Sequence, residues 1–382
     1  MRPGPSRRTN AARRSVAVVC ALAALTAGRA DAGQPAEWPS FRGSPDMSGV
    51  ARSSLPAKPE VLWRRQVNSA VESTAAIVGG RVYLGTQSGS VVCLDLKGGA
   101  PKWRFKASGP VSASPCVVGT RVYVGDEEGV FYALNAASGE KVWQFKTEGK
   151  IVSSATPAPG VVLFGSYDNH LYCLDAKTGE KKWAFQADSY VHGTPCVAGD
   201  VVVIAGCDGD VRMIGLKSGK EEASAETEGN FAAPPAYHDG HVFVGDMGGQ
   251  YRSVRCEDGK VVWEFEDPKG GACYGAAAVA GDRVVFPSRG RRVFCLNRKT
   301  GKLLWKARTG GQVDSSPVIV GGRAYVGCAD GNLYGLGLAN GKTAWKFRAG
   351  GAISASPAVA GGRLIIGTEK GTVYCLGGRT DP

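Results

Sequence analysis

Short apolar runs recur along most of the chain, and clusters of Gly, Asn, Asp and Ser separate them. The clearest copy spans residues 111–147, where the runs predict strands at 114–118, 121–125, 130–134 and 141–146. Runs of about five residues bounded by turn formers are typical of strands joined by hairpins. The pattern therefore predicts a unit of four short antiparallel strands.

This unit recurs with a nearly constant period. Seven tryptophans are spaced by 40 to 42 residues, apart from one interval of 80 with Ala223 at the missing position. A glycine lies four residues before every later position of the grid, from Gly99 to Gly341. A fixed period of this length indicates one supersecondary unit that is stacked many times. The seven tryptophans are Trp63, Trp103, Trp143, Trp183, Trp263, Trp305 and Trp345.

The number of units follows from a two-residue turn that occurs at the same position of every repeat. It joins the first two strands of each unit, and two-residue hairpins need the positive φ that Gly, Asp and Asn tolerate. The eight turns are Gly79-Gly80, Gly119-Thr120, Pro159-Gly160, Gly199-Asp200, Asp239-Gly240, Gly281-Asp282, Gly321-Gly322 and Gly361-Gly362.

The two ends of the repeat region complement each other. The last unit lacks a fourth strand, whereas a single strand pattern at 61–67 precedes the first unit. If residues 61–67 complete the eighth sheet, the ring closes without free edges. The sequence thus predicts an all-β fold over residues 60–380: an eight-bladed β-propeller of four-stranded antiparallel blades, closed by its N-terminal strand.

The repeat resembles that of the PQQ-like (quinoprotein-like) propeller family. The resemblance rests on VYVGDEEGVFYALNAASGEKVWQF at 122–145 and LFGSYDNHLYCLDAKTGEKKWAF at 163–185, and it covers about residues 59–379. It implies that each grid tryptophan docks on the neighbouring blade. A buried indole contributes a large apolar area, and its N–H seeks a partner.

Residues 1–32 have the features of a secretory signal peptide. Five arginines precede an apolar run at 16–27, and an A-x-A motif ends at Ala32. The run is too short to cross a bilayer, which takes about 20 apolar residues. We expect export to the periplasm or beyond, by the Sec or twin-arginine route, with no transmembrane segment left. Residues 33–59 form a lead-in that we expect to lie across one face of the ring.

The chain is basic, but its charges do not predict a nucleic-acid surface. The formal net charge is +12, and loss of six Arg and one Asp with residues 1–32 leaves +7. Lys and Arg recur singly at turns, as on a solvated surface, and only Arg289, Arg291 and Arg292 cluster. We expect a monomeric ring with protein partners in the cell envelope and no nucleic acid.

The cysteines follow the repeat. Ten lie after residue 32, and several occupy a position for a small apolar residue, such as Cys93 and Cys173, where another copy has Ala133. Pairs separated by 23 residues, Cys93 with Cys116 for example, fall on adjacent blades. Packed sheets lie about 10 Å apart, beyond the reach of a disulfide. We therefore expect free thiols.

One variable row of residues marks a candidate binding site. Each unit places a varied residue before its first strand, beside an apolar one, and strand side chains alternate between faces. The row consists of Glu72, Ser112, Val152, His192, Ala232, Tyr274, Asp314 and Ser354. We expect Glu72, His192, Tyr274 and Asp314 to surround a central funnel and bind a small ligand or a partner loop. The alternative is that they are solvated rim residues.

Units four and five depart from the repeat. Ala223 replaces a tryptophan beside Glu221 and Glu222, and the loop at 267–275 holds two extra residues. Such departures occur where packing has decayed or where residues serve contacts.

No motif predicts a catalytic residue. His238 and His241 flank a hairpin turn, and two His leave a zinc site short of ligands. Asp208 and Asp210 lack the spacing and the distal Glu of a calcium loop. We therefore assign no catalytic residue and no metal ligand.

Three functions are compatible with these features. The first is an exported, non-catalytic scaffold or ligand-binding propeller, similar to the BamB-type component of outer-membrane assembly. The alternative is a PQQ-dependent dehydrogenase with PQQ and Ca²⁺ at the funnel. That group has a vicinal Cys-Cys and a Trp on the cofactor, whereas this chain has no Cys-Cys and only Trp38 off the grid. The third is a sensor module of the kind that is fused to a signalling domain, and we expect no such domain in this sequence. The sequence favours the first.

Overall fold

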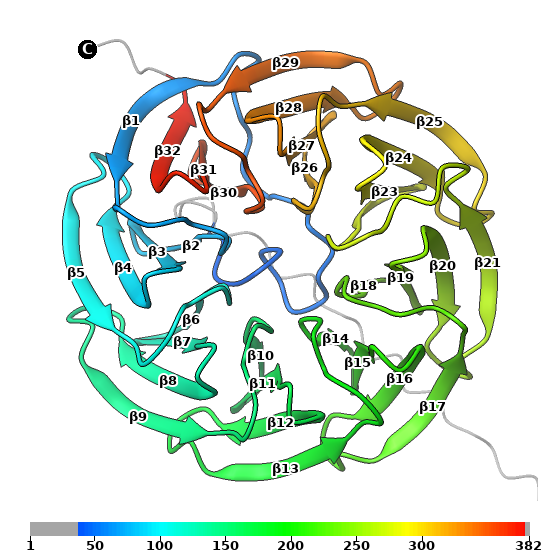
Figure 1. Ribbon diagram of the computed structural model, residues 1–382, viewed down its shortest axis with the longest axis horizontal. Helices are drawn as coiled ribbons and strands as arrows, with labels where there is room; N and C mark the ends of the chain where they lie inside the picture. Colours follow the sequence, from blue (N-terminus) through cyan, green and yellow to red (C-terminus); the bar gives the residue numbers. More distant parts are fainter. Residues whose placement is uncertain (1–36, 379–382) are drawn as a thin grey trace, which may run out of the picture. The chain divides into compact units, whose positions relative to one another are not determined.

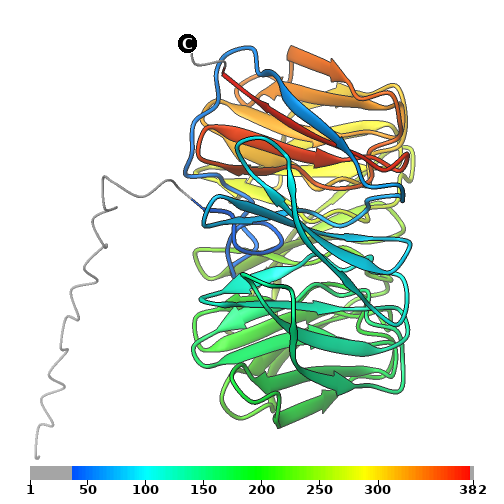
Figure 2. The same ribbon diagram turned by 90° about the vertical axis from the view of Figure 1, so that its left-hand side faces the viewer.

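The chain folds into a closed ring of eight four-stranded sheets. The computed structural model describes residues 37–378, in which 32 strands and no helix occur. All strand pairs within the sheets are antiparallel, and the sheets follow one another around the ring in chain order (Figure 1). Seen edge on, the strands cross the thickness of the ring from face to face (Figure 2). The predicted eight-bladed propeller is confirmed.

Each blade begins at the centre with a three-residue strand and ends at the outside with a six- or seven-residue strand. The strands of blades one to four are β2 (Ala76–Val78), β3 (Arg81–Thr86), β4 (Ser90–Asp95), β5 (Pro101–Lys106), β6 (Cys116–Val118), β7 (Arg121–Gly125), β8 (Val130–Asn135), β9 (Lys141–Lys146), β10 (Thr156–Ala158), β11 (Val161–Gly165), β12 (His170–Asp175), β13 (Lys181–Gln186), β14 (Cys196–Ala198), β15 (Val201–Ala205), β16 (Asp210–Gly215) and β17 (Glu221–Glu226).

Blades five to eight repeat the arrangement, and the last one takes its outer strand from the start of the repeat region. Their strands are β18 (Ala236–His238), β19 (His241–Gly245), β20 (Gln250–Arg255), β21 (Val261–Glu266), β22 (Ala278–Ala280), β23 (Arg283–Ser288), β24 (Arg292–Asn297), β25 (Leu303–Arg308), β26 (Val318–Val320), β27 (Arg323–Gly327), β28 (Asn332–Gly337), β29 (Thr343–Arg348), β30 (Ala358–Ala360), β31 (Arg363–Gly367), β32 (Thr372–Gly377) and β1 (Glu60–Gln66).

Strand β1 closes the ring. It pairs with β32 from Glu60 opposite Gly377 to Gln66 opposite Thr372, so the eighth sheet has the order β1-β32-β31-β30. This is the predicted closure, and it covers the edge of β32 that would otherwise be free.

The innermost strands are shorter than predicted. In the second blade the strand begins at Cys116, two residues after the predicted start. The reason is that Ser114 bonds between blades: its hydroxyl accepts from the Thr74 N–H at 2.9 Å, and its own N–H donates to the Ser154 hydroxyl at 2.9 Å. Backbone groups used in this way are not available to a strand ladder within the blade.

The grid tryptophans link each blade to the next. The Trp63 indole N–H donates to the Leu96 carbonyl at 2.9 Å, and Trp263 does the same to Arg298 at 2.8 Å. The indole of Trp63 covers Gly99, where a Cβ would come within 2.7 Å of the ring. The same contact explains the other grid glycines except Gly259, which faces the Ser224 backbone because Ala223 replaces the tryptophan.

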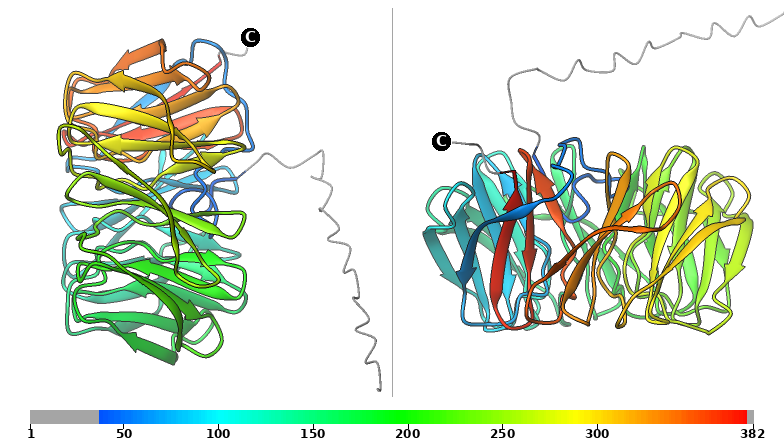
Figure 3. Two further views of the ribbon diagram at one scale, coloured as in Figure 1. Left: turned by 90° about the vertical axis from the view of Figure 1, so that its right-hand side faces the viewer. Right: turned by 90° about the horizontal axis from the view of Figure 1, so that it is seen from above.

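The lead-in closes the centre of the ring. Its carbonyls accept hydrogen bonds from the middle residues of the innermost strands, for example Pro39 from Val117 and Gly49 from Ile319, at 2.7 and 2.9 Å. The segment lies inside the ring, nearer to one face (Figure 3). The expected signal peptide at 1–32 lies outside the described residues.

Among residues 37–378, all ten cysteines are unpaired, as expected. No helix in this part of the chain is long and apolar enough to span a bilayer.

Candidate functional site

The four predicted rim residues line one central cavity. Glu72, His192, Tyr274 and Asp314 surround a funnel of about 340 Å³, and Phe41 of the lead-in belongs to the same lining. The loops between blades and the turns between second and third strands form this side of the ring, which we call the funnel face. Because the lead-in crosses the centre behind it, the funnel is a blind pocket.

A second row of side chains, not identified from the sequence, lies against the first. Its backbone N–H groups bond to the loops between blades, as Gln87 does to Ala70 at 3.0 Å. All its members occupy one repeat position, two residues beyond the position of Gly125, so superposing the turns would have found them. The row consists of Gln87, Glu127, Tyr167, Cys207, Met247, Arg289, Ala329 and Glu369.

Arg289 joins two of the predicted rim residues. Its Nε and Nη2 donate to the two carboxylate oxygens of Asp314 at 2.7 and 3.0 Å. Its guanidinium also lies over the Tyr274 ring, 3.7 Å from the centroid. A bidentate pair stacked on an aromatic ring is a rigid arrangement. Both carboxylate oxygens of Asp314 are therefore engaged by Arg289.

His192 belongs to an aromatic cluster on the other side of the funnel. The Tyr167 hydroxyl and His192 Nδ1 are 2.6 Å apart, and the rings of Tyr167 and Tyr190 stack at 4.6 Å. Tyr190 is 49% exposed, which is unusual for so large a ring. Burial lowers the pKa of His192, because the surroundings disfavour its charged form. A neutral imidazole can accept the hydrogen bond from Tyr167.

Glu72 lies in an acidic part of the rim. It accepts a hydrogen bond from the Gln87 amide at 2.8 Å, and that amide also donates to Ser112 at 3.0 Å. Burial, followed by repulsion from Glu369, raises the pKa of Glu72.

The funnel lining does not fit a PQQ–calcium pair. Calcium takes six to eight oxygen ligands, but Glu72 and Asp314 are the only carboxylates in the lining, and Arg289 occupies both oxygens of Asp314. PQQ carries carboxylates of its own, and the lining contains no Lys or Arg to bind them.

Among the described residues, only one group of three side chains is close enough together to bind a metal ion, and it lies outside the funnel. It consists of Asp188, in the loop before blade four, and of Asp208 and Asp210 in that blade. The buried Arg212 guanidinium pairs with all three at 2.6 to 2.8 Å. A guanidinium thus already occupies the place between these carboxylates where a metal ion would bind. His238 and His241 are opposite each other across their hairpin.

Two arginines of the 289–292 cluster are part of the same ion-pair pattern. Arg289 pairs with Asp314, and Arg292 pairs with Asp267 at 3.0 Å. Both guanidinium groups are therefore already paired with carboxylates.

Several solved structures share this architecture. BamB from Moraxella catarrhalis aligns with a TM-score of 0.74 at 19% identity, over 84% of this chain and all of that one. Quinohemoprotein alcohol dehydrogenase from Comamonas testosteroni gives 0.78 at 15%, over 91% and 81%. A europium-containing methanol dehydrogenase gives 0.78 at 12%, over 90% and 98%. At such low identity these likenesses show the fold alone.

The sequence itself matches one family. No curated protein sequence matches the chain. A family model described as outer membrane protein assembly factor BamB, however, matches residues 49–159, 149–222, 207–272 and 266–380. These segments cover nearly the whole propeller, including the lead-in residues from Gly49. The chain therefore belongs to the family of the outer membrane protein assembly factor BamB.

Proposed function

We propose that this chain is an exported, non-catalytic propeller that binds a protein of the cell envelope through its funnel face, as a scaffold similar to BamB. The observation that carries the proposal is the funnel itself. It is blind, and Glu72, His192 and Asp314 on its rim already make hydrogen bonds or ion pairs to neighbours.

A rim of this kind suits recognition better than chemistry. The side chains are held in place before any partner arrives, which lowers the entropic cost of binding. His192, the only imidazole in the funnel lining, has its Nδ1 engaged by Tyr167. The exposed Tyr190 and the ring of Tyr274 supply aromatic area of the type found in protein interfaces.

A dehydrogenase function remains the second candidate, because two of the aligned structures are alcohol or methanol dehydrogenases. The donor set of the funnel argues against it. The funnel lining offers one carboxylate outside an Arg pair, Glu72, where the calcium of such a site needs several oxygens.

Affinity capture from an envelope extract of the native cell tests the scaffold proposal. The bait is the purified chain, and the test variant combines Glu72→Ala, His192→Ala, Tyr274→Ala and Asp314→Ala. The control combines four exposed substitutions at third-to-fourth-strand turns of the opposite face: Glu140→Ala, Glu180→Ala, Lys217→Ala and Lys299→Ala. We expect a protein that is retained by the wild type and the control and lost with the rim variant. Equal retention by all three would contradict the proposal.

A further inference from the structure

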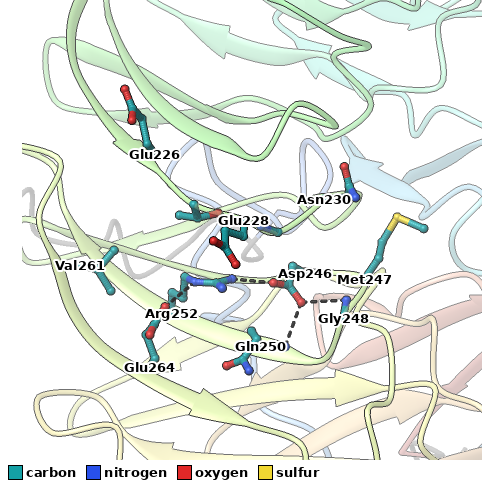
Figure 4. Close-up of a pocket in the computed structure, with 12 residues that line it drawn as sticks. Glu226, Glu228, Asn230, Asp246, Met247, Gly248, Gln250, Arg252, Val261 and Glu264 are labelled. Atoms are coloured by element: carbon teal, nitrogen blue, oxygen red, sulfur yellow. Dashed lines mark hydrogen bonds and ion pairs between the residues drawn. The ribbon is translucent and has the colours of Figure 1, made fainter.

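A second cavity opens between blades four and five. It has a volume of about 730 Å³, and its walls come from the loop at 226–230, the turn and strand at 246–252, and strand β21 (Figure 4). It lies on the funnel face, outside the rim, and Met247 belongs to both the cavity and the second rim row.

The cavity lies where two aromatic side chains of the repeat are missing. At four of the eight blade interfaces a Phe two residues after the grid tryptophan packs on an aromatic ring of the next blade. Examples are Phe105 on Tyr132, with centroids 5.2 Å apart, and Phe265 on Phe294 at 5.4 Å. Between blades four and five these two positions hold Ala225 and Arg252, and Ala223 replaces the tryptophan.

A second interface supports this explanation. Where β1 of blade eight meets blade one, the same two positions hold Arg65 and Val92, so both aromatic rings are again missing. A recess of about 330 Å³ opens there, and Arg65, Val92 and Arg104 line it. Loss of the aromatic pair thus leaves a recess at both interfaces, and the charge of the walls differs between them.

The floor of the larger cavity is a buried ion pair. Arg252 is 6% exposed, and its Nη1 donates to Asp246 at 2.6 Å while its Nε donates to Glu264 at 2.7 Å. Glu228 points toward this guanidinium from the other side (Figure 4). With Glu226, four carboxylates therefore line the cavity against one cation.

These carboxylates are spread along the cavity and do not meet at a point. Within residues 37–378 the one group of acids close enough to share a metal ion is that of blade four. Glu226 and Glu228 form no ion pair shorter than 4 Å in the described residues. A single metal ion therefore does not match this arrangement. A ligand that matches it carries several positive charges at intervals along a chain.

We propose that this cavity binds a linear polyamine, whose ammonium groups pair with Glu226, Glu228 and Glu264 above the Arg252–Asp246 floor. The volume is within the range of small-molecule sites. The surplus of negative charge is notable in a chain with a formal net charge of +12. This site is separate from the rim residues and does not depend on the proposed scaffold function.

Calorimetric titration of the full chain with spermidine tests the proposal. The test variant is Glu226→Gln with Glu228→Gln, which removes two exposed charges without disturbing the buried pair. The control, Glu140→Gln with Glu180→Gln, makes the same change of charge on the opposite face. We expect saturable binding that weakens about tenfold in the test variant and is unchanged in the control, in line with the strength of exposed ion pairs.

Three outcomes would overturn the proposal: no saturable binding by the wild type, an equal loss in both variants, or no loss in the test variant. A tetralysine peptide that binds through Glu226 and Glu228 where spermidine does not would also overturn it, in favour of a basic segment of a partner protein. The rim variant of the scaffold test should bind spermidine normally, so the two proposals can fail separately.

Discussion

At the scale of single residues, the sequence predicted which side chains share the funnel but not how they are paired. Glu72, His192, Tyr274 and Asp314 occupy one repeat position, and a period of 40 residues brings them around one axis. Their partners belong to a different turn of each blade. Asp314 pairs with Arg289 because the long Arg side chain extends from one blade to the next. The repeat pattern of the sequence does not predict this contact.

Burial of His192 gives a testable dependence of stability on pH. Because burial lowers its pKa in the folded state, the unfolded chain binds this proton more strongly. The free energy of unfolding should therefore fall as pH drops below about 6.5, by at most about 1.4 kcal/mol per pH unit for one proton. In His192→Gln this part of the slope should disappear.

Urea unfolding of the wild type and His192→Gln at pH 7.5, 6.5 and 5.5 measures this effect. His241→Gln, at a hairpin turn, is the control and should keep the wild-type slope. An identical pH slope in the wild type and His192→Gln would show that the burial of this ring has no energetic consequence.

At the scale of elements, the tryptophan grid predicted the blades, and its missing position coincides with the acidic cavity. The strand bounds follow from apolar runs bounded by turns, and the predicted strands at 121–125 and 141–146 match β7 and β9. The innermost strands were predicted too long because Ser and Thr hydroxyls there bond to the neighbouring blade. The cavity could not be predicted, because it requires knowing that a Phe and an aromatic of the next blade pack together.

The grid tryptophans should differ in their contribution to stability. Trp263 is 8% exposed and donates to Arg298, whereas Trp143 is half-buried and its indole N–H is buried without a partner. The Ala176 carbonyl, which would be its acceptor by analogy, accepts from Tyr123 at 2.7 Å. We expect Trp263→Ala to cost about 3–5 kcal/mol and Trp143→Ala to cost less.

Guanidinium-induced unfolding of the two variants, each compared with the wild type, gives this difference. Both substitutions remove the same atoms from equivalent strands, so each serves as the control for the other. An equal loss of stability would mean that the indole hydrogen bond and the depth of burial do not matter here.

At the scale of the whole molecule, the ring depends on strand β1 and is filled by the lead-in. The sequence predicted that β1 belongs to the last blade, because the last unit lacks one strand and the first strand pattern has no unit of its own. The path of the lead-in was not predictable, since residues 37–55 carry no repeat. They are placed by individual hydrogen bonds, such as Trp38 with Ile77.

Two truncations separate these roles. A chain that starts at residue 67 lacks β1 and exposes the edge of β32, so we expect it to aggregate. A chain that starts at residue 59 keeps β1 but loses the lead-in, and we expect a folded ring of lower stability. Size-exclusion chromatography and chemical unfolding distinguish the two. A stable monomer from residue 67 onward would contradict the role assigned to closure.

The central claim is that the funnel binds a partner and does not hold a quinone cofactor. Calorimetric titration of the purified chain with PQQ, with and without Ca²⁺, tests it most directly, because the fold is shared with quinone-dependent dehydrogenases while the lining residues differ. We expect no heat beyond dilution under either condition. Tight binding that depends on calcium would contradict the account and would make an alcohol dehydrogenase assay the next experiment.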